Sequence, residues 1–319
     1  MHAYEDALLV PDESVELYCG PLAEMPWAEF WLNPRMLRGS DFLMRWSQGV
    51  WSEKRLIEAV NATERFFAVP YGPSGVAPED PRGVELYFEK LEAAGIQGQK
   101  RPDLLVFRRE HESAVRSLVE SIGGESEIPF VNEADGRIQD LLGRAILAVE
   151  CENSLWYAAK MPAYGKEMNA KRLAQGKPGF AKTAVLPTVI VKDEDVDRLV
   201  AWQTHHRVPI HVWHVFFDRA FGISLDGARE IFATGRIAKT LQTFQAPGGA
   251  TTQKGIYKIY YLYAYELGVS LEEPSLKAQA IVDRNGHVLP YVTFEGGRLQ
   301  LGNAAVGVLS DLQHRGGER

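Results

Sequence analysis

Three acidic residues have the types and positions needed for metal chemistry. Asp103 opens an apolar segment, and Glu150 and Glu152 close another. If both segments are strands, alternation places the two glutamates on one face, and neighbouring strands bring Asp103 to the same edge. Carboxylates held close together repel one another, so a nearby cation is needed to stabilise them. The trio therefore predicts an Mg²⁺ site, where the metal activates a water and neutralises charge on a phosphodiester.

A simpler interpretation makes the glutamates an exposed strand end and Asp103 a turn residue. Two features favour the metal site: the strand is otherwise apolar, and a basic segment, residues 159–182, follows it. In a chain of net charge −7, this local basic stripe predicts a phosphate backbone as partner, with a solvated loop as the alternative. Its six cations are Lys160, Lys166, Lys171, Arg172, Lys177 and Lys182.

Strand and helix patterns alternate through the middle of the chain, which predicts an α/β fold with a mixed, partly parallel sheet flanked by helices. Three regions are expected: a mainly helical region at 1–83, a core at 84–232 and a β-rich region at 233–319. The expected strands are 103–109, 144–152, 184–192 and 208–217. The expected helices are 36–66 (as one or two helices), 83–94, 111–124, 154–161, 193–207 and 226–235.

Two short motifs resemble the PD-(D/E)xK nuclease superfamily in the form used by type II restriction endonucleases. In "RPDLLVF", Pro102-Asp103 matches the PD, and in "AVECE", Glu150 matches the acidic position. Glu152 stands where the pattern has lysine, which is similar to a minority ExE form. Weaker resemblance covers most of residues 40–225. The resemblance implies a restriction-endonuclease-like fold and Mg²⁺-dependent hydrolysis of double-stranded DNA, with Asp103 and Glu150 as metal ligands.

The departures from the family pattern leave roles open. Either Glu152 binds metal or polarises the water, or Lys160, two turns along the following helix, supplies the positive charge. The 47 residues between Asp103 and Glu150 exceed the usual spacing, so a helix is expected between them. An acid from the helix before Asp103 can join the metal shell in this fold, with Glu85 or Glu89 as candidates and a solvated helix face as the alternative.

Two polar segments are candidates for reading DNA. A Gly-rich tip between two expected strands carries side chains of the kind that read base edges, and a two-stranded ribbon fits the major groove; a plain polar hairpin is the alternative. The tip residues are Gln242, Gln245, Thr251, Thr252, Gln253 and Lys254. The segment "SQGVWSEKR" adds Ser47, Gln48, Lys54 and Arg55 as backbone or minor-groove contacts. His211 and His214 differ in strand parity, so a structural role is favoured over zinc.

Composition narrows the function classes. Two cysteines, Cys19 and Cys151, provide neither a disulfide framework nor a cysteine zinc site. No run has the apolar length of a membrane span, so a cytoplasmic enzyme without a membrane partner is expected. The expected function is a type II restriction endonuclease, acting as a homodimer on two-fold sites. A repair or recombination nuclease of the same fold, or a DNA-binding protein without catalysis, are the alternatives.

Overall fold

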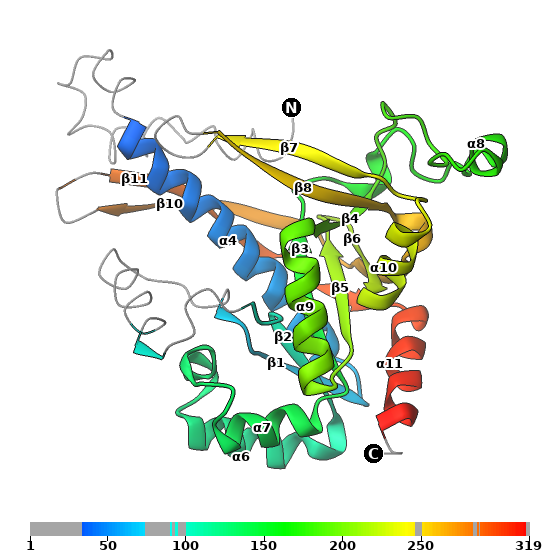
Figure 1. Ribbon diagram of the computed structural model, residues 1–319. Helices are drawn as coiled ribbons and strands as arrows, with labels where there is room; N and C mark the ends of the chain where they lie inside the picture. The colour runs from blue at the N-terminus through cyan, green and yellow to red at the C-terminus, as the bar shows by residue number, and fades with distance from the viewer. Residues whose placement is uncertain are drawn as a thin grey trace.

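A computed structural model describes residues 34–73, 90, 93–94, 100–245, 251–282, 286 and 288–316. Its central feature is a seven-stranded sheet in the order β1-β2-β3-β5-β6-β9-β12 (Figure 1). Only β3 and β5 pair in parallel, so the sheet is mixed, as predicted. The strands are β1 (Phe66–Pro70), β2 (Leu104–Arg108), β3 (Leu147–Asn153), β5 (Ile210–Val215), β6 (Arg219–Ser224), β9 (Tyr265–Ser270) and β12 (Leu299–Leu301).

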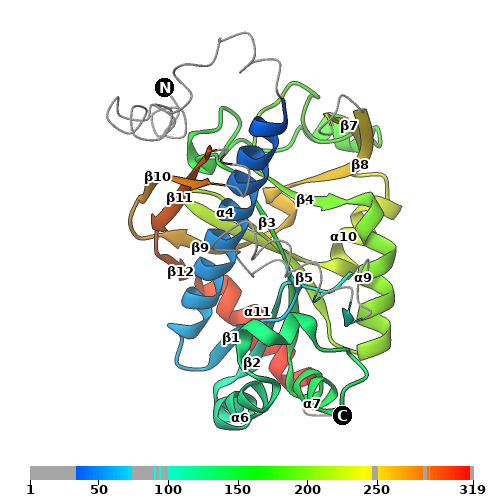
Figure 2. The ribbon, with the colours of Figure 1, turned by 90° about the vertical axis from the view of Figure 1, so that its left-hand side faces the viewer.

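Helices cover both faces of this sheet. One face packs against α4 (Pro34–Asn61) and α11 (Asn303–Gly316), and the other against α6 (Glu112–Ile122), α7 (Gly136–Arg144) and α9 (Asp193–His206) (Figure 2). Alternation along β2 explains the two layers. Leu105 and Phe107 join the core beneath α6, α7 and α9, whereas Leu104 and Val106 join the core beneath α4 and α11.

Two smaller sheets flank the main one. The first has the order β4-β8-β7, and the second is the antiparallel pair β10-β11. The β10-β11 pair lies in the segment that was expected to be rich in β structure, and Gly286, between its two strands, has φ of 82°. The bounds are β4 (Thr188–Lys192), β7 (Lys239–Gln245), β8 (Thr251–Tyr260), β10 (Pro274–Val282) and β11 (Val288–Gly296), with helices α8 (Ala170–Ala174) and α10 (Leu225–Ala233) nearby.

Some elements differ from the sequence prediction. The segment 154–161 is not a helix: only a 3-10 turn, Ala158–Lys160, forms there. Ser154 instead donates its backbone N–H to Val215 O at 2.9 Å, and Asp218 accepts from the backbone N–H groups of Ala158 and Ala159 at 2.7 and 2.9 Å. The carboxylate of Asp218 therefore holds the backbone that was expected to form the first helical turn.

Strands β1 and β6 and helices α7 and α11 were not predicted. Residues 66–70 pair along the whole of β2, so their apolar side chains are buried by a strand distant in sequence. Between β2 and β3 the chain forms two helices, α6 and α7, where one was expected. Strands from all three predicted regions share the seven-stranded sheet. The expected helix 83–94 lies mostly outside the described residues.

Candidate active site

Asp103 is held against β3, as its predicted position at the sheet edge requires. Strands β2 and β3 are antiparallel with Leu104 opposite Val149, so the same register places Asp103 opposite Glu150. The backbone N–H of Asp103 donates to Val149 O at 2.8 Å, and its carboxylate Oδ2 accepts from the Cys151 N–H at 2.6 Å. The Asp103 carboxylate therefore lies at the strand segment that carries both glutamates.

A close approach of two backbones fixes Asp103 from its other side. Its carbonyl oxygen accepts from the N–H groups of Tyr71 and Gly72, at 2.7 and 3.1 Å. A Cβ atom at Gly72 would lie 2.7 Å from Pro102 O and 3.1 Å from Asp103 Cα. Only glycine fits there without displacing Asp103, which gives the glycine of "VPYG" a specific role.

Each glutamate is paired with a lysine that the sequence prediction did not include. Glu150 is buried, at 4% exposure, and its Oε1 accepts from the Lys100 ammonium. The Glu152 Oε1 atom accepts from Lys192 Nζ at 2.7 Å. Lys100 lies three residues before Asp103, a position that could have been noticed. Lys192 ends β4 in another sheet, so only the tertiary fold brings it to Glu152.

Buried carboxyl groups lie close together in this site, which disfavours their charged forms. Burial raises the pKa of Glu150 well above its ordinary value, and the nearby Asp103 raises it further. Burial also raises the pKa of Glu152, which Lys192 partly opposes. The second carboxylate oxygen of Glu150, Oε2, is buried without a hydrogen-bond partner. A buried carboxylate oxygen of this kind is costly unless something binds it.

In the described part of the chain the carboxylates do not by themselves form a complete cation site. Within the residues that the structure describes, no three His, Cys, Asp or Glu side chains meet as a complete metal-binding group. Mg²⁺ does not require one, because it commonly keeps several waters and binds one or two carboxylates together with substrate phosphate. Asp103, Glu150 and Glu152 are the residues that would hold it, with Glu150 Oε2 as an available ligand.

Lys160 does not lie among the carboxylates. Its ammonium lies 3.9 Å from the centre of the Tyr157 ring, and the side chain is exposed. In the described part of the chain it makes no ion pair with Asp103, Glu150 or Glu152. The interpretation of Lys160 as a cation projected from a helix onto the phosphate is not supported by this geometry, because the helix that would carry it is absent.

The rest of the basic segment lies on the surface. It contains the short helix α8, which projects from the edge of the molecule in Figure 1. Lys166, Lys171, Lys177 and Lys182 are exposed, whereas Arg172 is half-buried and donates from Nε to Pro178 O at 2.9 Å. The four lysines can therefore reach a phosphate backbone without rearrangement of the core.

The β7-β8 ribbon is attached beside the carboxylate site. Lys239 Nζ lies 3.0 Å from Asp193 Oδ2, and Lys254 Nζ lies 2.6 Å from Glu194 Oε1. Both acids open α9 directly after Lys192. Of the predicted base-reading side chains, those of Gln242 and Gln253 are exposed. The side chains of Gln245, Thr251 and Thr252 lie outside the described residues.

Arg55, predicted as a DNA contact, is a buried structural residue. Its guanidinium donates to Gly297 O, to Phe216 O at 3.0 Å and to Phe217 O at 3.2 Å. Its neighbour Lys54 is exposed, 3.8 Å from Glu58, and Gln48 is half-buried. Glu85 and Glu89, the predicted acids of the preceding helix, lie outside the described residues.

A buried polar cluster positions the segment that leads into Asp103. Glu133 Oε1 accepts from Tyr71 Oη and from Trp202 Nε1 at 2.8 Å, and Oε2 lies 3.1 Å from His206 Nε2. The guanidinium of Arg101 is buried 3.2 Å from Glu133 and donates to Val131 O at 3.0 Å. Glu133 thus links α9 and Tyr71 to the residue two before Asp103.

We expect Glu133→Gln to destabilise the fold in a pH-dependent way. Burial alone would raise the pKa of Glu133, but the hydrogen bonds from His206, Tyr71 and Trp202 more than offset it and lower the pKa to about 2. A depressed carboxyl pKa stabilises the folded state above the unfolded pKa of about 4.5, and this stabilisation is lost as the pH falls towards 2. The variant should lose about 2–3 kcal/mol of unfolding free energy at pH 7.

Denaturant unfolding of both proteins at several pH values measures this. The deficit of the variant should shrink between pH 4.5 and pH 2, because wild-type Glu133 is protonated there. Gln at Glu120, an exposed position of α6, serves as the control and should leave stability unchanged. A deficit that stays constant over this pH range would contradict the assignment.

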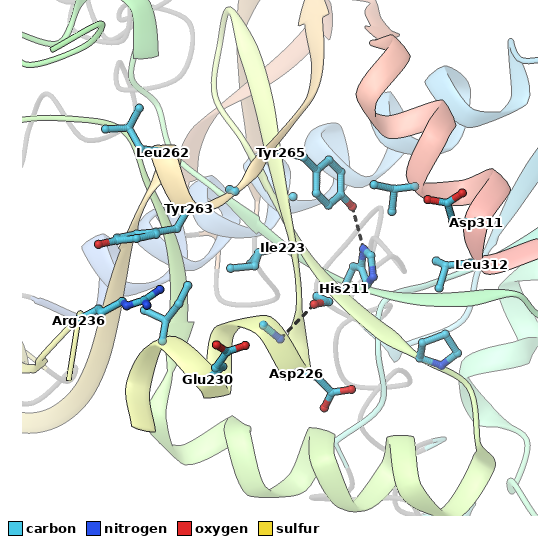
Figure 3. A pocket seen from close by; sticks show the side chains of 17 residues that line it. His211, Ile223, Asp226, Glu230, Arg236, Leu262, Tyr263, Tyr265, Asp311 and Leu312 are labelled. Atoms are coloured by element: carbon cyan, nitrogen blue, oxygen red, sulfur yellow. Dashed lines mark hydrogen bonds between the residues drawn. The ribbon is translucent and has the colours of Figure 1, made fainter. Parts of the chain in front are cut away.

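The two strand histidines take separate structural positions, as their parity predicted. His214 is buried, with Nε2 2.8 Å from Ser154 Oγ, and burial lowers its pKa to about 3. His211 lies on the opposite face, with Nδ1 2.8 Å from Tyr265 Oη. It lines a pocket of about 730 Å³ bordered by β6, α10 and α11 (Figure 3). None of the acids of the carboxylate site lines this pocket.

The fold and site define a mixed α/β protein with a lysine-paired carboxylate cluster at a sheet edge. Residues 34–175 match the model of the AccI restriction endonuclease family. The matched range includes Lys100, Asp103, Glu150 and Glu152. The match supports a type II restriction endonuclease, and therefore a DNA-binding endodeoxyribonuclease. No curated protein and no solved structure matches the chain. No helix in the described ranges has the length and apolarity to cross a membrane.

Proposed function

We propose that the chain is a type II restriction endonuclease of the PD-(D/E)xK kind in its ExE form. It cuts both strands of DNA at a specific palindromic sequence in the presence of Mg²⁺, as a homodimer whose two-fold symmetry matches that of the site. The observation that carries the proposal is the meeting of Asp103 with β3 at Glu150 and Glu152, where Glu150 Oε2 is buried without a hydrogen-bond partner.

The acidic and basic residues have different roles in the proposed reaction. Asp103, Glu150 and Glu152 hold Mg²⁺, which when bound lowers the pKa of a water and offsets charge on the scissile phosphate. Lys100 balances the charge of buried Glu150. Lys192 is more exposed than Lys100, so its ammonium can donate to a phosphate oxygen while it keeps Glu152 in place. Lys192 thereby takes the part of the missing motif lysine, and the exposed lysines of 166–182 bind flanking phosphates.

Replacing Lys192 tests whether Lys192 or Lys160 takes the role of the missing motif lysine at the phosphate. We expect Lys192→Ala to lower the single-turnover cleavage rate by about a hundredfold or more, since it removes one preorganised donor at the reacting phosphate. Lys192→Arg should recover part of the rate because the charge is kept. Lys160→Ala is the matched control and should stay within about threefold of wild type, because Lys160 lies on Tyr157. If Lys160→Ala cleaved much more slowly than Lys192→Ala, Lys160 would be the residue that replaces the motif lysine.

Digestion of plasmid and genomic DNA with Mg²⁺, followed by sequencing of the ends, tests the function itself. Discrete fragments whose ends share one palindromic sequence are expected. Nicks at junctions or flaps without a shared sequence would indicate a repair or recombination nuclease. Binding without any cleavage would leave a DNA-binding protein.

A further inference from the structure

The β7-β8 ribbon belongs to the same small sheet as the lysine that pairs with Glu152. That sheet has the order β4-β8-β7, and β4 ends at Lys192, whose Nζ lies 2.7 Å from Glu152 Oε1. Lys192 pairs with Ile256 of β8, and Ile256 pairs in turn with Thr240 of β7. Continuous strand pairing therefore connects the ribbon to the carboxylate site.

Two ion pairs also join the ribbon to the start of α9, directly after β4. Figure 1 shows β7 and β8 side by side above this helix. Lys239 of β7 reaches Asp193, and Lys254 of β8 reaches Glu194. Gly255 permits a close contact, because a Cβ atom there would lie 2.9 Å from Asp193 Cβ. The two acids that follow β4 are therefore held by both strands of the ribbon.

The ion pairs are not needed to hold the small sheet together. Their four side chains are 38–48% exposed, and ion pairs in such positions add little stability. The sheet has its own apolar core, in which Val189 and Val191 of β4 are buried with Ile259 of β8. What the ion pairs do is fix the start of α9, and with it the end of β4, relative to the ribbon.

The ribbon itself carries side chains suited to DNA. Gln242 and Gln253 are exposed, glutamine hydrogen-bonds base edges, and a two-stranded ribbon fits the major groove. We propose that the ribbon reads bases and that Asp193 and Glu194 transmit its position on the DNA to Lys192. Lys192 then meets the scissile phosphate only when the ribbon is seated in its groove. This inference rests on the proposed nuclease function and makes the two acids positioning residues.

Neutralising both acids tests this role. We expect Asp193→Asn/Glu194→Gln to lower the single-turnover rate at saturating protein by about tenfold or more, because Lys192 is no longer held relative to the ribbon. Its dissociation constant for a duplex that spans a mapped cleavage site, measured without Mg²⁺, should stay within about threefold, since no phosphate contact is removed. Asp197→Asn, an exposed acid of the same helix, is the matched control and should cut as wild type does.

A double-mutant cycle tests whether the effect passes through Lys192. In a Lys192→Ala protein, the two acid substitutions should lower the rate by less than about twofold, because the residue that they position is already absent. Thermal unfolding of Asp193→Asn/Glu194→Gln should stay close to that of wild type, because the ion pairs are half exposed.

Exchanging the charges of one ion pair gives a rescue experiment. Lys254→Glu and Glu194→Lys should each lower the cleavage rate, since each places like charges together. The protein with both changes regains an ion pair and should recover most of the rate. A direct phosphate contact by Lys254 would instead leave the combined variant as impaired as Lys254→Glu, in binding and in cleavage.

Three further results would overturn the inference: wild-type cleavage by Asp193→Asn/Glu194→Gln, a loss of binding as large as its loss of rate, and an equal loss of rate with and without Lys192. These outcomes leave the proposed nuclease function standing. A wild-type protein that neither binds nor cuts DNA would remove the proposed function together with the inference.

Discussion

Glu150→Gln is expected to abolish cleavage, with a fall in rate of about a thousandfold or more, and to leave DNA binding largely intact. Gln keeps the shape of the side chain but removes the charge that Mg²⁺ and Lys100 require. Duplex binding should persist, because the exposed lysines of 166–182 are unchanged. Single-turnover cleavage and gel-shift binding on the same duplex measure the two effects.

Stability provides a second readout for this variant. The pKa of Glu150 is raised by burial and by Asp103, so its ionised form opposes folding at neutral pH. Glu150→Gln relieves the burial of this charge but leaves the Lys100 ammonium without its partner, so thermal unfolding must be measured beside cleavage to separate a loss of activity from a loss of fold. Exposed Glu120→Gln, the control, should retain full cleavage. A Glu150→Gln protein that cuts at near the wild-type rate would remove Glu150 from the metal site.

Arg55→Met is expected to be the most destabilising single change, with a loss of about 3–5 kcal/mol of unfolding free energy. Arg55 is 2% exposed, and its guanidinium lies 4.3 Å from the centre of the Trp51 ring and donates to Ser270 Oγ at 2.9 Å besides three backbone carbonyls. Burial lowers its pKa only to about 10, so the group stays charged at neutral pH. Methionine fills part of the space but leaves these acceptors without a donor.

Lys54→Met, one residue earlier and exposed, is the matched control and should change stability by less than about 0.5 kcal/mol. Denaturant unfolding of the two variants against wild type measures the difference. An Arg55→Met protein that is as stable as wild type and binds DNA weakly would restore the prediction of Arg55 as a DNA contact.

The sequence pattern indicated the positions of the acidic residues but not the lysines that pair with them. Alternation along β3 predicted that Glu150 and Glu152 share a face, and the β2-β3 register places Asp103 opposite Glu150; the role of the three carboxylates as metal ligands stays a prediction. Lys192 could not be derived in the same way. Lys192 reaches Glu152 from β4 in a separate sheet, and β4 pairs with residues of β8 that lie 64 to 72 positions further along the chain.

The failed predictions have a common physical cause. Segments 66–70 and 154–161 have weak local signals, and distant partners decide their structure. Residues 66–70 form β1 because each of them pairs with a residue of β2. The backbone after Glu152 is held by hydrogen bonds to the Asp218 carboxylate rather than by helical hydrogen bonds. Arg55 looked like a surface cation because its three carbonyl acceptors, at Phe216, Phe217 and Gly297, are distant in sequence.

Single-turnover cleavage of one DNA substrate tests the central claim most directly. Wild type and Asp103→Asn would be compared with Mg²⁺ and with a chelator in place of Mg²⁺. The account predicts discrete double-strand cuts by wild type with Mg²⁺ only, and intact DNA that is still bound by Asp103→Asn. Cleavage by wild type in the presence of the chelator, or equal cleavage by Asp103→Asn, would contradict it.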